Sequence, residues 1–171
     1  MAIEKSSRHS KIVGQFGEAL AANLLSRSGF EVILADHIGF DLIAFRADVG
    51  RLGISVKSRT RGKQGSEEVS VNLFDVADTK LEKSCRDFGL IPWVAVYVET
   101  EASGDLYLTS LDNYKDRHLG GKKMLVWNMR QQHRDMYAQD QGVMHFQMTF
   151  AENNWFDRTL SASLAEVTTD E

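Results

Sequence analysis

The sequence predicts an α/β domain in which helices and strands pack as layers around one core. Three observations predict this fold class. A helical pattern opens the chain, short strand patterns follow it, and a second helical pattern precedes a continuous apolar, β-branched run at residues 93–99. Such a run is typical of a strand that is buried on both faces of a sheet. An α+β arrangement of the same elements is the alternative.

The first part of the chain divides into one helix and three strands. Residues 12–28 are expected to form a helix that stops at Gly29. Their apolar side chains recur at three- and four-residue steps: Val13, Phe16, Leu20 and Leu24. Residues 30–34 have the pattern of a short strand. Residues 40–46 and 52–58 are expected to pair as a hairpin, because the turn-like sequence ADVGR joins them.

The second part begins with a helix expected at residues 73–88, which ends before Gly89. The buried strand at 93–99 follows, and Pro92 is tolerated at its entrance because the first residue of a strand need not donate a ladder hydrogen bond. The elements expected beyond it are strands at 105–110, 123–128 and 143–150 and a short helix at 111–118. We expect a single domain 1–171, with a core at about 12–99, a sheet extension at about 100–160 and a loose tail at 161–171.

The composition excludes several classes of protein. A chain of 171 residues suits one compact domain, and no apolar run approaches the roughly 20 residues that a transmembrane helix needs. The N-terminal segment lacks the apolar stretch of a secretory signal. The single cysteine, Cys85, cannot form an internal disulfide. Gly14 and Gly17 are not followed by the lysine and hydroxyl of a phosphate-binding loop. We therefore expect a cytoplasmic protein with no membrane partner and no organic cofactor.

The net charge of −4 argues against a protein coated in positive charge for non-specific nucleic-acid binding. The acidic excess lies at the C-terminus, because the sequence from Phe150 onward has five acidic residues and a single basic one, Arg158. A basic cluster lies elsewhere, at Lys57, Arg59, Arg61 and Lys63. Any phosphate contact must therefore be local. The arginines and Lys63, with Ser58, belong either to a solvated loop or to a surface that guides phosphate groups.

Three polar side chains occupy positions where the pattern favours an apolar residue. Glu18 lies among small and apolar neighbours on the first helix, so it faces whatever that helix packs against. Asp41 opens the second strand. Lys57 ends the third strand and shares one face with Ser55, because side chains alternate along a strand. If the two strands pair as a hairpin, Asp41 and Lys57 meet at its open end.

This set of side chains suits phosphodiester hydrolysis. A carboxylate such as Asp41 at the end of a strand can hold a hard divalent cation, Mg²⁺ or Mn²⁺, through oxygen. Such a cation activates water and neutralises charge in the transition state. Lys57 can orient or deprotonate that water, and Glu18 can add a second ligand.

The string G-x-x-G-E … L-L-x-x-x-G-F … G-F-D-L-I-A … S-V-K-S resembles the PD-(D/E)XK nuclease superfamily, in particular its Holliday-junction resolvase-like and Mrr-like branches. The resemblance covers about residues 12–99. It implies a restriction endonuclease-like αβββαβ core, with a mixed central sheet flanked by helices and strand-rich C-terminal additions. It also implies a DNA endonuclease that depends on Mg²⁺ or Mn²⁺ and works as a homodimer. In such an enzyme Asp41 and Glu18 are metal ligands, Lys57 is the catalytic lysine and Ser55 is an auxiliary.

One position departs from the superfamily pattern. The acid of the acid-x-lysine motif is Ser55 here, and a hydroxyl is a poorer metal ligand than a carboxylate. Three outcomes remain open. Glu67 or Glu68 supplies the missing acid, a water held by Ser55 with Glu18 compensates, or catalysis is lost. The last outcome leaves a nucleic-acid-binding or protein-interaction module on the same fold.

Each candidate residue also has a structural interpretation. Asp41 alone suits a strand entry after Gly39. Glu18 and Lys57 could form a structural ion pair, and Lys57 alone could protect an edge strand from aggregation. Only the three residues together favour a catalytic site. Aromatic residues late in the chain are expected in the core or in a dimer contact: Trp127, Phe150, Trp155 and Phe156.

Overall fold

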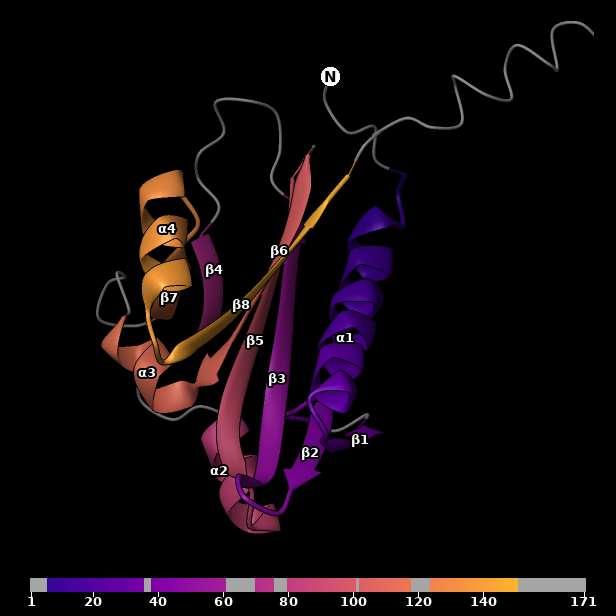
Figure 1. The fold of residues 1–171 in the computed structure, drawn as a ribbon, viewed down its shortest axis with the longest axis vertical. Coiled ribbons are helices and arrows are strands. Elements are labelled where there is room, and N and C mark those ends of the chain that lie inside the picture. The colour runs from indigo at the N-terminus through magenta and orange to yellow at the C-terminus, as the bar shows by residue number, and fades with distance from the viewer. Residues whose placement is uncertain are drawn as a thin grey trace, which may run out of the picture.

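The computed structural model describes residues 6–35, 38–60, 70–75, 80–100, 102–117 and 124–150. The elements in chain order are α1 (His9–Arg27), β1 (Glu31–Leu34), β2 (Leu42–Arg46), β3 (Gly50–Thr60), β4 (Ser70–Asp75), α2 (Lys80–Phe88), β5 (Ile91–Glu99), β6 (Ser103–Ser110), α3 (Leu111–Asp116), β7 (Met124–Asn128), α4 (Gln131–Gln139) and β8 (Val143–Thr149). They form an α/β fold with helices on both sides of a central sheet (Figure 1). None of the helices in these ranges is long and apolar enough to cross a bilayer.

The central sheet has six strands in the order β1-β2-β3-β5-β6-β8. Neighbouring strands run antiparallel except β3 and β5, which pair in parallel from Leu52 and Ile91 to Thr60 and Glu99. A parallel pair needs a crossover connection, and the crossover between these two strands contains β4 and α2. β4 pairs instead with β7 in a separate antiparallel sheet. The central sheet is therefore mixed, as the sequence predicts.

The two faces of the central sheet carry separate apolar cores, because side chains alternate along each strand. On β3, Ile54 and Val56 belong to the core that α1 covers. The opposite face packs against α2, α3 and α4, and it takes up Val94 and Val96 of β5. Figure 1 shows α1 on one side of the sheet and α3 and α4 on the other. Ser55 alternates with Ile54 and Val56, so it belongs to the face away from α1.

An aromatic stack anchors α3 and α4 to that second face. The ring of Trp127 lies between the rings of Tyr114 and Tyr137, with centroid distances of 4.6 and 4.1 Å. The indole N–H of Trp127 also donates to the carbonyl of Tyr114 at 3.1 Å. Trp127 is fully buried, so it occupies the core, one of the two locations expected from the sequence.

The structure confirms the opening helix, the three strands after it and the buried strand β5, and it corrects the second helix. That helix was expected at residues 73–88, but it begins at Lys80, and residues 70–75 form β4. The segment SVNLFD pairs with β7, which is distant in sequence. Such tertiary pairing outweighs a local preference for helix. Residues 76–79 lie outside the described part of the chain.

Helix α4 is absent from the sequence-based expectations. Its residues are mostly polar, and only Arg134 and Tyr137 are buried. A helix that docks through two side chains lacks the apolar periodicity by which helices are recognised. By contrast, β6, α3, β7 and β8 lie where strands and a short helix were expected.

Candidate active site

Asp41 lies where the hairpin of β2 and β3 opens. Its backbone N–H donates to the carbonyl of Ile54 at 2.8 Å, and its own carbonyl accepts the N–H of Ala35 at 2.8 Å. These bonds fix Asp41 between β1 and β3, one residue before β2 begins. The pairing of β2 with β3 ends at Leu42 and Ile54, whereas β3 continues to Thr60. Beyond Ile54, the edge of β3 next to β2 has no strand partner among the described residues. We call this stretch the open edge of β3.

The side chain of Asp41 binds the open edge of β3. Its Oδ2 atom accepts the backbone N–H of Val56 at 2.6 Å and the hydroxyl of Ser55 at 3.3 Å. The carboxylate thus accepts the Val56 N–H, which a backbone carbonyl of a neighbouring strand would otherwise accept. Its Oδ1 atom accepts no hydrogen bond from any residue that the structure describes. Oδ1 is therefore the oxygen that can bind a cation or a water molecule.

Ser55 and Lys57 lie on one face of β3, opposite Val94 and Val96 of β5. Ser55 is 2% exposed, and its hydroxyl is committed to Asp41. Lys57 is half-buried and follows directly after Val56, whose amide Asp41 accepts. The geometry joins Asp41 with the Ser55-x-Lys57 segment at the open end of the hairpin.

Helix α1 approaches the end of β3 through a residue without a side chain. A Cβ added at Gly17 would lie 2.2 Å from the hydroxyl oxygen of Ser58. This close approach brings the backbone of α1 at Gly17 against the end of β3, and Glu18 is the next residue of the helix. Glu18 is half-buried there. Lys57 points to the opposite face of the sheet from Ser58, because side chains alternate along β3. A ligand that contacts both Glu18 and Lys57 would therefore have to lie across the open edge of β3.

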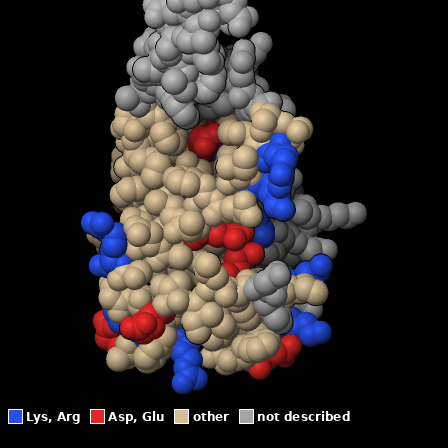
Figure 2. Space-filling view, turned by 90° about the vertical axis from the view of Figure 1, so that its right-hand side faces the viewer, with Lys and Arg blue, Asp and Glu red and all other residues tan. Residues whose placement is uncertain are grey.

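The molecular face on the α1 side has an uneven distribution of charged side chains. Figure 2 shows acidic side chains gathered near the middle of a mostly uncharged face, with a basic side chain beside them. Most other charged groups in this view lie toward the rim.

The oxygen donors around the open edge suit a hard divalent cation in kind but fall short in number. Asp41 and Glu18 supply carboxylates, whereas Ser55 supplies a hydroxyl where a third carboxylate is expected. Across the described ranges, no group of three or more His, Cys, Asp or Glu side chains could hold a metal ion. Glu67 and Glu68, the candidates for a relocated acid, lie outside those ranges.

Two of the predicted nucleic-acid contacts, Ser58 and Arg59, border a cavity of about 370 Å³ between the first turn of α1 and the end of β3. Its polar lining includes His9, Ser10, Ser58, Arg59 and Thr60. Arg59 is exposed, and its Nη1 atom donates to the carbonyl of Ser58 at 2.8 Å. The first turn of α1 has no acidic residue and no side-chain cap. The lining therefore favours an anion. Arg61 and Lys63 lie outside the described residues.

A phenol lies beneath α1 close to these groups. The ring of Tyr97 on β5 packs edge-on against Phe16 at a centroid distance of 5.4 Å, and the residue is fully buried. Burial raises the pKa of Tyr97, and the negative charges of Glu99 and Asp105 raise it further. The phenol is therefore neutral at physiological pH and carries no charge into the site.

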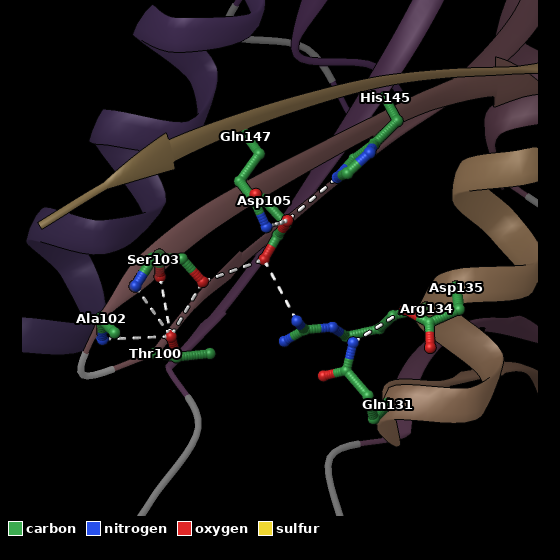
Figure 3. Close-up of polar contacts among 9 residues, drawn as sticks. All are labelled: Thr100, Ala102, Ser103, Asp105, Gln131, Arg134, Asp135, His145 and Gln147. Carbon is green, nitrogen blue, oxygen red and sulfur yellow. Dashed lines mark hydrogen bonds and ion pairs between the residues drawn. The ribbon is translucent and has the colours of Figure 1, made fainter.

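A second polar cluster lies on the face of the sheet away from α1, the face that also carries Ser55 and Lys57, and the sequence reasoning missed it (Figure 3). Asp105 of β6 is 1% exposed. Its carboxylate accepts from His145 and Gln147 of β8 at 2.9 Å each, and it lies 3.6 Å from the guanidinium of Arg134 on α4. Ser103 donates to it at 3.3 Å. A buried charge with this set of partners fixes α4 and β8 to the sheet.

Sequence spacing could not reveal the Asp105 cluster, because its members come from β6, α4 and β8. One signal was present in the sequence. Asp105 alternates with Tyr107 and Thr109, so it was foreseeable that its carboxylate shares a face with these two side chains. Its partner Arg134 lies in the helix that the sequence did not predict.

Comparisons with solved structures identify the fold. The Holliday junction resolvase Hjc of Archaeoglobus fulgidus, an archaeal hyperthermophile, is similar over 72% of this chain and 88% of its own, with 20% identity and a TM-score of 0.50. The bacterial homing endonuclease I-Ssp6803I is similar over 94% of this chain and 96% of its own, with 13% identity and a TM-score of 0.43. No protein-family model and no curated protein sequence matches the chain. The predicted restriction endonuclease-like fold is confirmed.

Proposed function

We propose that this protein is an endonuclease that hydrolyses phosphodiester bonds in DNA with the help of Mg²⁺ or Mn²⁺. The observation that carries the proposal is the hydrogen bond from Val56 to Asp41, which holds a carboxylate on the open edge of β3 one residue from Lys57. A fold in common with a Holliday junction resolvase supports the same conclusion.

Asp41 is the principal metal ligand in this proposal. Its Oδ2 atom is held by Val56 and Ser55, so the carboxylate cannot turn away and Oδ1 remains directed to a ligand. Glu18, the half-buried residue of α1 that follows Gly17, would serve as a second ligand or as the residue that positions a water. A divalent cation held there would supply a Lewis acid that polarises the phosphate and activates water.

Lys57 is the catalytic lysine. Its ammonium group can donate to the attacking water or to a non-bridging phosphate oxygen, and either contact stabilises the negative charge that develops in the transition state. Ser55 is an auxiliary group, because its hydroxyl keeps Asp41 in place. A half-buried lysine is well suited to this task because its charge is screened less than that of a surface lysine.

The DNA backbone would pass over the cavity between α1 and β3. Arg59 and the Ser58 and Thr60 positions provide cationic and hydroxyl groups at this cavity. In sequence, Arg61 and Lys63 continue the same basic cluster. Contacts of this kind position phosphates without reading bases, so the proposal assigns binding to the backbone and leaves base recognition open.

One observation favours a second candidate function, a catalytically inactive nucleic-acid-binding module. Ser55 is buried against Asp41, so the third-strand position that should carry an acid offers only a hydroxyl. A protein limited in this way would still bind DNA, with an affinity that falls steeply as salt rises. Such a module would not need a divalent cation.

A homodimer in the cytoplasm forms part of the proposal. The edge strand β1 exposes Ile33 (62%) and Leu34 (69%), and Ile38, the fourth residue after Leu34, is 77% exposed. Exposed large apolar side chains at the edge of a sheet favour a protein contact. Light scattering coupled to size exclusion would give twice the mass of the chain, and Ile33→Asp would restore the monomer.

The experiment that tests the proposal uses linear, supercoiled and branched DNA with and without Mn²⁺. Wild-type protein should cleave at least one of these substrates in a metal-dependent reaction, and Asp41→Asn should not cleave any. Binding without cleavage, with equal affinity in Mn²⁺ and in EDTA, would support the inactive module instead. No binding to any of the three DNAs would reject both candidate functions.

A further inference from the structure

A groove of about 490 Å³ runs beside α1 over the last two strands of the central sheet. Apolar side chains form most of its walls: Leu24 and Leu25 from α1, Leu106 and Leu108 from β6, and Met144 and Phe146 from β8. It lies along the C-terminal half of α1, whereas the cavity at Ser58 and Arg59 lies at the N-terminal end of that helix. The two hollows are therefore separate.

The groove leaves large apolar groups exposed on the face that α1 covers elsewhere. Met144 and Phe146 are 53% and 38% exposed. They pair with Leu108 and Leu106, which belong to the core beneath α1. α1 itself packs mainly against β1, β2, β3 and β5, so the layer of helices stops short of β8. The helices of the described ranges therefore leave this apolar part of the sheet partly uncovered.

The chain beyond β8 contains a segment with the right pattern. Residues 151–171 follow the last described residue, Phe150. Their apolar side chains recur at steps of four, four and three residues: Phe156, Leu160, Leu164 and Val167. This spacing is typical of one apolar face on a helix. Ala162 and Ala165 fall on the opposite side of the same helical wheel.

The reach of this segment and the spacing of its apolar side chains both suit the groove. The N–H of Phe150 donates to the carbonyl of Ala102 at 2.8 Å, which fixes the point where the tail leaves the sheet. Five extended residues span up to about 17 Å, enough to turn back over β8 before Phe156. Four residues of a helix advance about 6 Å, and two residues of a strand advance about 6.6 Å. The apolar steps of the tail therefore match the alternate side chains of β8.

We propose that residues 156–167 dock in this groove beside α1, with Leu160 against Phe146 and Leu164 against Met144. Charge favours this location, because Arg27 lines the groove and is exposed, while the tail carries the acidic excess of the chain. Docking would hold the acidic residues beside the C-terminal half of α1, away from Arg59 at the other end of the helix. The proposal does not depend on catalysis.

Disulfide formation in the full chain tests this placement. Met144→Cys combined with Leu164→Cys should form an intramolecular disulfide roughly tenfold faster than Met144→Cys combined with Ala162→Cys, because docking raises the effective concentration of the facing thiol only. Met144 is exposed, so both pairs should fold alike. Peptide mass mapping under non-reducing conditions identifies the bond and separates it from the buried native Cys85.

A second substitution distinguishes docking from chance contact. Adding Leu160→Asp to the Met144→Cys, Leu164→Cys protein should slow its disulfide formation to the rate of the Ala162→Cys pair. Adding Ala165→Asp instead should leave the faster rate unchanged. Equal rates in the two cysteine pairs would overturn the proposal, because an undocked tail samples both positions alike. A disulfide that forms mainly between two chains would also overturn it, since a second copy would then occupy the groove.

Discussion

The Oδ2 atom of Asp41 lies 2.6 Å from the backbone nitrogen of Val56. The bond is formed just past Leu42 and Ile54, the last pair that β2 makes with β3. It gives Asp41 a structural task, because the Val56 amide would otherwise lose its acceptor. It also places the carboxylate next to Lys57. Substitutions at Asp41 should therefore separate a structural effect from a catalytic one.

Asp41→Asn should abolish metal-dependent cleavage with little change in stability. The amide oxygen of Asn can still accept the Val56 N–H, but the neutral group is a weak ligand for a hard cation. Asp41→Ala removes the acceptor as well and should lower the free energy of unfolding by about 2 kcal/mol. Urea denaturation with a cleavage assay measures both effects. Equal stability of the Asn and Ala variants would contradict the structural role.

Ser55→Asp should raise the affinity for Mn²⁺ by restoring a carboxylate at the third-strand position. Because position 55 is buried against Asp41, the two negative charges should destabilise the metal-free protein by about 1–3 kcal/mol. Thermal unfolding with and without Mn²⁺ measures this. The metal should raise the melting temperature of Ser55→Asp more than that of the wild type. Ser55→Asn is the neutral control, and an equal metal response in both variants would contradict the prediction.

Two glycines of α1 form a matched pair for testing how the helix meets β3. Gly14→Ala should stabilise the protein by about 0.5–1 kcal/mol, because a Cβ there meets no atom within 4 Å and alanine favours helix. Gly17→Ala should destabilise it by about 1 kcal/mol or more, since a Cβ would crowd Ser58 and lie 3.2 Å from the Cβ of Tyr97. Chemical denaturation compares the two. Equal effects would mean that α1 does not approach β3 closely at Gly17.

Asp105→Asn should be among the most destabilising single changes outside the site. It leaves the buried guanidinium of Arg134 without its carboxylate partner, a loss that typically costs about 3–5 kcal/mol. Asp116→Asn, at an exposed position on α3, is the control and should cost little. Denaturant titration of both variants checks the difference. A small effect at Asp105 would show that α4 is held by the aromatic stack alone.

Local sequence patterns were sufficient to predict most of the fold. The apolar spacing around Val13 and Leu24, the ADVGR turn and the run at 93–99 each carry a local signal, and α1, the β2–β3 hairpin and β5 follow from them. The missing elements lack such a signal. β4 depends on pairing with β7, and α4 depends on two buried side chains. Interactions between distant segments decide both, so local periodicity could not predict them.

For the candidate site, the sequence was sufficient to predict that the start of β2 and the end of β3 lie close together. It was not sufficient to predict the hydrogen bonds that form there. Strand alternation was enough to place Ser55 and Lys57 on one face and Asp41 near them. The hydrogen bond to the Val56 amide could not be foreseen, because it depends on β2 ending before β3 does. The closeness of α1 at Gly17 likewise depends on how the helix packs. The roles of Glu18, Asp41, Lys57 and Ser55 in catalysis stay predictions.

Single-turnover cleavage of DNA by Lys57→Ala tests most directly the proposed role of Lys57 as the catalytic lysine beside Asp41. With Mn²⁺ present, this variant should cleave about 100-fold or more slowly than the wild type, while its fold and its DNA affinity change little. Lys83→Ala, at an exposed position on α2, is the control and should cleave at the wild-type rate. Cleavage by Lys57→Ala at the wild-type rate would contradict the account.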